Sequence, residues 1–227
     1  MLLIPGIINS ARSNKLGENM NIVTIDFDII MGPSIGVYNN AVNEDFKVDS
    51  IIEDYPFLSN VPADLNIYEY LTRYIVDVIK VLPQDKIQFI RSHEQIVPLV
   101  SKYRDANLIN IDHHHDIGYE IEDWTKPIVG KPQCGNWVKK LFDTKVINHY
   151  DWVSNPLSDV LPDEAAEIYN VEDHLLKDYS LIDLAKSTDI LIICQSFEWV
   201  PRMYQPLFYT WVGIYEEITG RKYTLID

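Results

Sequence analysis

Five short runs rich in Val and Ile set the strongest limit on how this chain can fold. They span residues 22–27, 86–91, 108–112, 145–149 and 189–194. None of them alternates polar with apolar residues, which is typical of strands covered on both faces, as in a parallel sheet. Segments with helical periodicity separate them. This order predicts a three-layer α/β/α fold with a mainly parallel sheet.

Five segments carry helical signals, at residues 64–82, 94–103, 135–142, 181–186 and 201–219. The first repeats apolar residues such as Leu71, Tyr74 and Val78 at intervals of three and four, so it should bury one face. Asp64 is expected to cap its start, and Gly220 to end the last helix. Residues 32–61 and 154–170 fit no regular element. They are either functional loops or elements that the sequence predicts poorly.

The size and composition of the chain predict a single globular domain. It has 227 residues, of which 47% are hydrophobic, enough for one substantial core. We expect residues 20–227 to form this domain and residues 1–19 to be an N-terminal extension that need not belong to the fold. No apolar run is long enough to span a membrane. The two cysteines, Cys134 and Cys194, fit free thiols in a reducing compartment, which predicts a cytoplasmic protein.

The net charge limits the choice of partner. It is −15, from 34 acidic and 19 basic side chains. Contacts to phosphate need a basic face, so no nucleic-acid partner is expected. A cationic substrate or bound metal ions fit this charge better, although most of the acidic residues should form an ordinary solubilising surface.

The densest signal for chemistry is the run Asp112-His113-His114-His115-Asp116, which ends a buried strand. Ligands of open α/β sheets gather at the carboxyl ends of strands. Carboxylate oxygens and imidazole nitrogens together suit Mn, Fe, Co or Zn, and buried unpaired carboxylates are very costly. The run therefore predicts a metal site. The alternative is an exposed polar turn with incidental histidines.

Two further segments place potential ligands at strand ends. Asp26 and Asp28 close the first strand two residues apart, which would put both on one face of an extended strand. His93 directly follows the second strand. Each has an ordinary alternative, either the solvent-facing end of a strand or a histidine bonded to the backbone at a helix start. Together, however, four carboxylates would repel each other unless cations lay between them, which predicts two divalent ions.

These motifs resemble the metal-ligand set of the arginase-like ureohydrolase superfamily. The resemblance is closest to the branch that includes the peptide arginases, which convert arginine residues of ribosomally made peptides into ornithine. Its markers are Ser92-His93-Glu94-Gln95 with Pro98, then Asn110-Ile111-Asp112 and its histidine run, then Gly135-Asn136-Trp137. It covers residues 92–152 and the strand that ends at Asp26.

Three features depart from ordinary arginases. The acidic pair at residues 26–28 precedes the run at residues 112–116, whereas in ordinary arginases it follows. Residues 31–33 read Met-Gly-Pro, where an Asp-Pro pair would continue. Val138 stands two residues after Asn136, at the place of the usual proton-shuttle histidine.

The resemblance implies a site for two Mn²⁺ ions and a role for each residue. Asp112 and Asp26 would bridge the ions, His93 and Asp116 would complete the first, and His114 and Asp28 the second. The other expected site residues are Glu198 for the guanidinium, Asp151 and Asn136 for substrate binding, and His113, His115 or His149 as the general acid. The implied reaction converts arginine in a precursor peptide to ornithine and urea.

Three other functions fit the same residues. A small-molecule ureohydrolase would act on free arginine or agmatine. A deacetylase-like amidohydrolase would share the fold, but it generally uses one metal and a tandem histidine pair in a glycine-rich loop, which this chain lacks. A non-catalytic metal-binding module would explain the missing shuttle histidine but not the complete ligand set. The sequence leaves the oligomeric state open.

Overall fold

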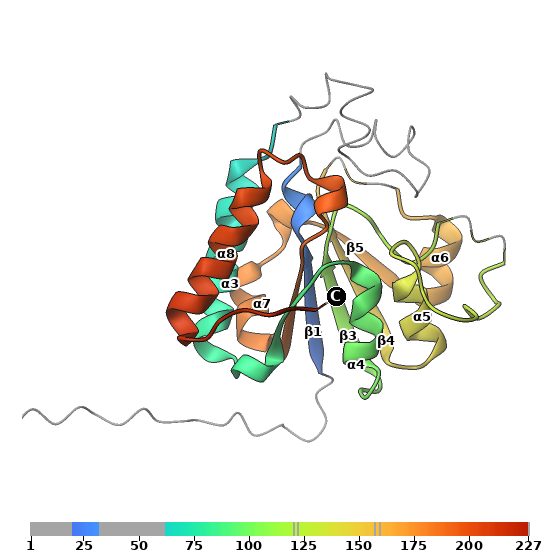
Figure 1. The fold of residues 1–227 in the computed structure, drawn as a ribbon. Helices are drawn as coiled ribbons and strands as arrows, with labels where there is room; N and C mark the ends of the chain where they lie inside the picture. The colour runs from blue at the N-terminus through green and yellow to red at the C-terminus, as the bar shows by residue number, and fades with distance from the viewer. Residues whose placement is uncertain are drawn as a thin grey trace, which may run out of the picture.

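The computed structural model describes residues 20–31, 62–119, 121, 123–156, 158 and 160–226. Its strands form one seven-stranded sheet in the order β5-β4-β3-β1-β6-β2-β7. Every pair of neighbouring strands is parallel. The predicted three-layer α/β/α architecture is therefore confirmed (Figure 1). The expected extension at residues 1–19 and the irregular stretch at 32–61 lie outside the described residues.

The five predicted strands are all present in the described part of the chain, and two edge strands join them. The bounds are β1 Asn21–Asp26, β2 Ile87–Ile90, β3 Ala106–Ile111, β4 Ile147–Ser154, β5 Val171–Leu175, β6 Ile190–Cys194 and β7 Leu225–Ile226. The predicted end of β4 at residue 149 is wrong, because the strand continues to Ser154. The edge strand β5 reads Val-Glu-Asp-His-Leu and is mostly accessible to solvent, so it lacks the apolar pattern that identified the buried strands.

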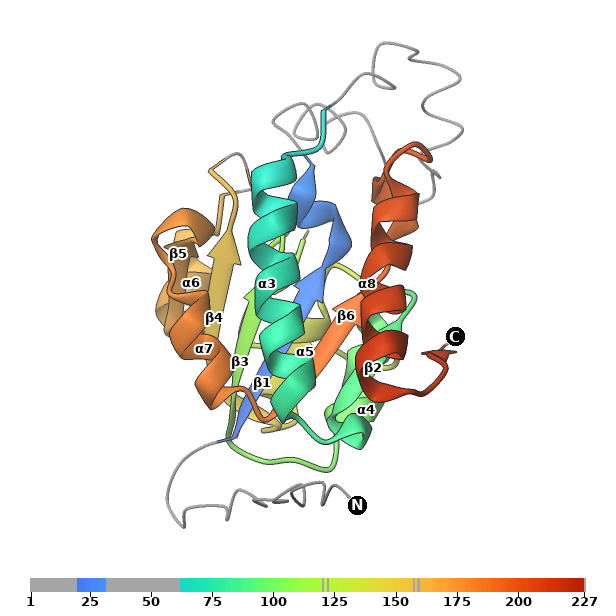
Figure 2. The same cartoon turned by 90° about the vertical axis from the view of Figure 1, so that its left-hand side faces the viewer.

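Helices cover both faces of the sheet. They are α3 Leu65–Val81, α4 Ile96–Val100, α5 Trp137–Asp143, α6 Asp163–Tyr169, α7 Leu181–Ser187 and α8 Gln205–Thr219. Short 3₁₀ turns lie between the elements, η1 Phe27–Ile30, η3 Gln84–Lys86, η4 His93–Gln95, η5 Leu176–Asp178 and η6 Phe197–Trp199. Helices α3, α7 and α8 pack on one face, and α4, α5 and α6 on the other (Figures 1 and 2). Helix α6 lies within the stretch 154–170 that was expected to be irregular.

The predicted helix signals correspond to real caps and a real buried face. The side chain of Asp64 accepts hydrogen bonds from the backbone N–H groups of Asn66 and Ile67 at the start of α3. Apolar residues of α3, Leu71, Tyr74, Ile75, Val78 and Ile79, are buried as the periodicity predicts. Gly220 ends α8 with a φ of 69°, a left-handed conformation that favours glycine. None of the described helices has the length and apolar character needed to cross a bilayer.

The order of the strands determines what meets at the carboxyl edge of the sheet. Strand β1 lies between β3 and β6, and β2 lies beside β6. Ile25 pairs with Ile111, so the next residues along these strands, Asp26 and Asp112, lie side by side. Asp26 also pairs with Cys194 at the end of β6. Polar residues at the ends of four neighbouring strands are thus brought to one place.

Candidate metal centre

The six side chains predicted as metal ligands form one buried cluster at the carboxyl edge of the sheet. They come from β1 and η1 (Asp26, Asp28), from the start of η4 (His93) and from the turn after β3 (Asp112, His114, Asp116). The four carboxylates and His93 are at most 5% exposed, whereas the His114 side chain is 12% exposed. So much charge buried together needs compensation by ion pairs, protons or cations.

The cluster divides into two groups that share Asp112. In the first, Nδ1 of His93 lies 2.8 Å from Oδ2 of Asp116 and 3.3 Å from Oδ2 of both Asp26 and Asp112. The ligand atoms of His93, Asp112 and Asp116 all lie within 4.8 Å of one another.

The second group joins Asp112 to the tip of β1. Nδ1 of His114 lies 3.1 Å from Oδ2 of Asp28 and 3.9 Å from Oδ1 of Asp112. The ligand atoms of Asp28, Asp112 and His114 also lie within 4.8 Å of one another. Asp112 therefore turns one carboxylate oxygen toward each histidine. This is the arrangement expected of a carboxylate that bridges two cations.

Local turns, and not a continuous strand, direct these side chains. The expectation that Asp26 and Asp28 share a face of an extended strand is wrong, because β1 ends at Asp26 and Asp28 lies in η1. The turn after β3 begins with a hydrogen bond from the backbone N–H of His114 to Oδ1 of Asp112, at 2.9 Å. Asp116 then adopts a left-handed conformation with φ 49°. Such conformations are sparsely populated outside glycine and concentrate at functional sites.

Neighbouring donors hold the carboxylates in place. The indole Nε1 of Trp137, at the start of α5, donates to Oδ2 of Asp116 at 2.6 Å. The hydroxyl of Ser196 donates to Oδ2 of Asp26 at 2.8 Å, and the amide of Asn110 donates to Oδ2 of Asp112 at 3.0 Å. Partners of this kind orient the ligands of metal sites and raise their affinity.

Burial and crowding raise the pKa values of two of the carboxyl groups in the cluster. Burial, and next the charge of Asp28, raises the pKa of Asp26 to about 7. Burial, and next the charge of Asp116, raises the pKa of Asp112 well above its usual value. Oδ1 of Asp28 is buried and has no hydrogen-bond partner among the described residues. The cluster thus has carboxylate oxygens to spare for a cation.

Both histidines respond to the same excess of negative charge. Burial would lower the pKa of His114, but Asp28 beside it raises that pKa to about 10. Burial would likewise lower the pKa of His93, yet Cys194, Asp26 and Asp112 raise it well above the usual value. The surrounding carboxylates thus favour positive charge at both histidine positions. A donor set of carboxylates and imidazoles could hold metal ions of the Mn, Fe, Co or Zn class.

The three histidines predicted as general acids lie in different surroundings. The ring of His113 is buried, with its centroid 5.4 Å from that of His114. His115 stacks on Tyr119 with 4.4 Å between the ring centroids, and its Nδ1 accepts a hydrogen bond from the backbone N–H of Ile117. His149 lies near the start of β4, where it pairs with Asn107. It is therefore far from the carboxyl ends of the strands, where the centre lies. The structure therefore brings His113 to the centre and separates His149 from it.

The residues predicted to bind substrate are only partly brought to the centre. Asp151 lies within β4, in register with Ile109, and pairs with His149 at 2.7 Å; the expectation that it follows the end of the strand is wrong. Glu198 lies in η6 after β6, and its side chain is outside what the structure describes. Its neighbour Trp199 lies beside the centre, with ring centroids 5.4 Å apart between Trp199 and His114.

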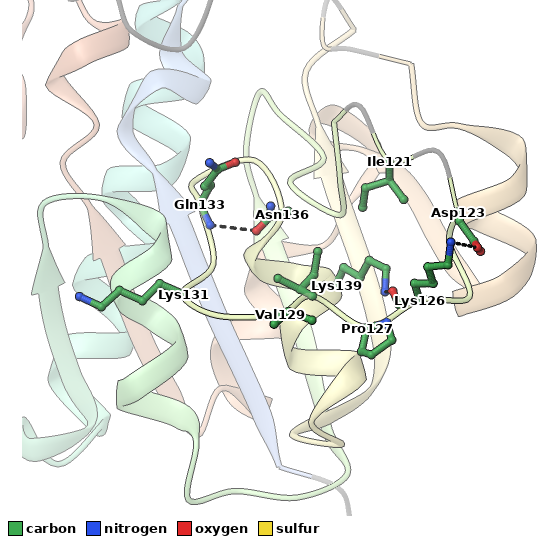
Figure 3. A pocket seen from close by; sticks show the side chains of 10 residues that line it. Ile121, Asp123, Lys126, Pro127, Val129, Lys131, Gln133, Asn136 and Lys139 are labelled. Carbon is green, nitrogen blue, oxygen red and sulfur yellow. Dashed lines mark hydrogen bonds and ion pairs between the residues drawn. The ribbon is translucent and has the colours of Figure 1, made fainter.

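Asn136 lies at the edge of a hollow of about 600 Å³ (Figure 3). Its Oδ1 accepts a hydrogen bond from the backbone N–H of Gln133 at 2.9 Å. Lys126 and Lys131 also line the hollow. None of the six predicted ligands lines the hollow, so it is a separate surface. Its link to the centre is Trp137, the residue after Asn136, whose indole donates to Asp116.

The sequence analysis did not assign several residues that support the centre. Asn110 and Thr24 are polar residues inside otherwise apolar strands, and the Thr24 hydroxyl donates to the side chain of Asn110. That pattern could have identified them as a buried pair. Trp137 was noticed only as a marker of resemblance, and Ser196 was not singled out. The conformation of Ser196, with φ 39°, carries no clear signal in the sequence.

Comparison with known proteins identifies no relative. No family model, no curated protein and no solved structure matches the chain. The resemblance to ureohydrolases therefore stays a prediction from the motifs. The function of the chain has to be inferred from the geometry of its described residues.

Proposed function

We propose that this chain is a two-metal hydrolase that cleaves the guanidino group of arginine residues in a peptide, giving ornithine and urea. The observation that carries the proposal is the position of Asp112, whose two carboxylate oxygens belong to two separate groups of ligand atoms. A single-ion site would not need a second complete group. Asp26, near His93, supplies a further carboxylate to the first group.

The donor chemistry supports manganese as the resident metal. Four carboxylates and two imidazoles, with Nδ1 as the facing nitrogen of each ring, form a hard donor set that suits Mn²⁺. When bound, two such ions supply Lewis acidity and an activated water for hydrolysis of a C–N bond. His93 and Asp116 would complete one ion's protein ligands, and His114 and Asp28 the other's.

The chain's own residues suit a guanidinium substrate attached to a peptide. The ring of Trp199 lies beside that of His114, tilted by 51° with 5.4 Å between the centroids, which supports Trp199 as the aromatic neighbour of a planar cation. Glu198, the residue before Trp199, is the proposed anionic partner of the guanidinium. The leaving amine needs a proton, and His113 is the histidine near the centre that can supply it.

The test is an assay with arginine-containing peptides. The purified chain, loaded with Mn²⁺, should convert arginine to ornithine with a mass loss of about 42 Da for each residue converted. Asp112→Asn should lower the rate at least 100-fold, because it removes the shared ligand. Asp173→Asn is the matched control, because Asp173 is an acid on β5 outside the cluster, and its rate should equal the wild type.

Two results would go against the proposal. Equal peptide turnover by the wild type and Asp112→Asn would show that Asp112 takes no part in the reaction. Turnover of free arginine or agmatine without turnover of any peptide would assign the centre to a small-molecule ureohydrolase instead.

A further inference from the structure

A second cluster of metal-ligating side chains lies on the far half of the sheet, on strands β4 and β5. His149 and Asp151 project from β4, and Glu172 and His174 from the edge strand β5. Asp151 pairs in register with Glu172, and Val153 with His174, so all four side chains share one face of the sheet. The proposed arginine chemistry uses none of them in this position.

The cluster is separate from the centre at the strand ends. His149 pairs with Asn107, whereas Asp112 follows the end of the same strand β3. A strand rises about 3.3 Å per residue, so His149 lies roughly 16 Å from Asp112 along the sheet. Glu172 and His174 lie on β5, two strands and roughly 10 Å to the side of β3. The two sites therefore share no ligand.

The donor atoms of the cluster lie close to one another, with His149, Asp151 and Glu172 as its compact part and His174 beside them. Nε2 of His149 lies 2.7 Å from Oδ1 of Asp151, and Nε2 of His174 lies 3.9 Å from the same oxygen. Nε2 of His174 lies 3.5 Å from Oε2 of Glu172. Ligand atoms of His149, Asp151 and Glu172 all lie within 4.8 Å of one another. Donors of a tetrahedral zinc ion are about 3.3–3.5 Å apart. The 2.7 Å hydrogen bond between His149 and Asp151 would therefore open on binding, and His174 would move toward the other three ligands.

A neighbouring tyrosine holds the central carboxylate of this cluster. The hydroxyl of Tyr179 donates to Oδ2 of Asp151 at 3.2 Å, which leaves Oδ1 facing the two histidines. The backbone oxygen of Tyr179 accepts a hydrogen bond from the hydroxyl of Tyr70 on α3, which anchors it. A tyrosine hydroxyl can donate this hydrogen bond while the carboxylate keeps its other oxygen for a cation. This is the supporting contact that metal-binding carboxylates commonly have.

We propose that His149, Asp151, Glu172 and His174 bind one transition-metal ion, with Zn²⁺ as the best match, and that this ion fastens the edge strand β5 to β4. Two imidazoles with two carboxylates are a zinc donor set, and four protein ligands leave no open position for catalysis. The site would therefore be structural. It would protect an edge strand whose side chains are mostly accessible.

The experiment is a zinc titration of the metal-free full chain in competition with a chromophoric chelator. His174→Ala should bind one Zn²⁺ ion fewer per chain than the wild type. The same loss should occur in the Asp112→Asn background, because the two sites are separate. Glu172→Gln should weaken the second site at least tenfold. The Glu172 side chain is 56% exposed, so this variant is expected to fold normally even if His174→Ala does not.

Asp173→Asn is the matched control, because Asp173 is the next residue on β5 and pairs with Trp152 on the other face of the sheet. It removes one negative charge from the same strand but none of the four proposed ligands, so its zinc binding should equal the wild type. Equal zinc stoichiometry and affinity in the wild type, His174→Ala and Glu172→Gln would overturn the proposal. Equal weakening by Glu172→Gln and Asp173→Asn would reduce it to a general effect of surface charge.

Discussion

Asp26 shows, at the scale of single residues, how ligand binding and stability conflict in this molecule. Its carboxylate is buried beside Asp28, and its pKa is raised to about 7. An acid whose pKa is higher in the folded than in the unfolded state makes folding less favourable as the pH rises from the unfolded-state pKa to the folded-state pKa. The penalty grows from the usual value near 3.8 and is complete above about 7.

We predict that Asp26→Asn stabilises the metal-free protein by about 1–3 kcal/mol at pH 8 and has little effect near pH 4. The asparagine keeps an acceptor for the backbone N–H of Asp28 and can donate to Ser196. Urea unfolding at both pH values measures this. In the presence of manganese the order should reverse, because the variant loses a ligand. A variant less stable than the wild type under all these conditions would contradict this account of Asp26.

Trp137 shows that a residue outside the ligand set can tune the centre. Its indole donates to Asp116, and its ring lies 5.2 Å from that of His93. Trp137→Phe keeps most of the packing but removes the donor, so manganese affinity should fall 10- to 100-fold. Metal titration of the metal-free chain measures this.

Trp211→Phe is the control for this change. Trp211 is also fully buried and donates from Nε1, but to Thr72 on α3 and not to the centre. Both variants should lose similar stability, and only Trp137→Phe should lose metal affinity. A similar loss of affinity in both would mean that Trp137 acts through general destabilisation.

At the scale of elements, helix α8 offers a test of how its end is formed. Gly220 and Gly213 both have open space where a Cβ would be added, but only Gly220 has a positive φ, of 69°. Gly220→Ala should therefore destabilise the protein by about 1 kcal/mol. Gly213→Ala lies inside the helix and should stabilise it by roughly 0.5–1 kcal/mol. Thermal unfolding separates the two, and a shift of the same sign in both would contradict the assigned cap.

The elements predicted correctly are those whose signals are local. The apolar run of β1 and the periodicity and cap of α3 depend on neighbouring residues alone. Strand β5 was not predicted because it lies at an exposed edge, where hydrogen bonds to β4 outweigh a polar sequence. Helix α6 spans only seven residues, too few for a clear helical period. The true end of β4 was missed for a similar reason, since Asp151 looks like a strand terminus in sequence but pairs with Glu172 across the sheet.

In the candidate centre, too, local features could be predicted from the sequence and those that depend on distant contacts could not. The ligand types and their places at strand ends follow from the sequence, because carboxylates after buried strands are costly without cations. The turns at Asp28 and Asp116 could not be predicted from the sequence. They depend on contacts from distant parts of the chain, such as those of Trp137 and Ser196. For the same reason, the displacement of His149 from the centre could not be read from spacing.

At the scale of the whole molecule, the sheet topology explains how the acidic pair can reach the candidate centre although it precedes the histidine run in the sequence. The pair Asp26 and Asp28 comes early in the sequence, unlike in ordinary arginases. Strand β1 nevertheless lies between β3 and β6, so its tip meets Asp112 directly. A metal site depends on which strand ends are neighbours, and a parallel sheet can bring the same ends together in more than one chain order.

The measurement that tests the central claim most directly is a crystal structure of the chain grown with manganese, with anomalous scattering recorded at the manganese absorption edge. We predict two anomalous peaks at the strand ends, about 3.5 Å apart, both within bonding distance of Asp112. One peak would lie beside His93 and the other beside His114. A single peak, or an Asp112 carboxylate that touches neither, would contradict the claim.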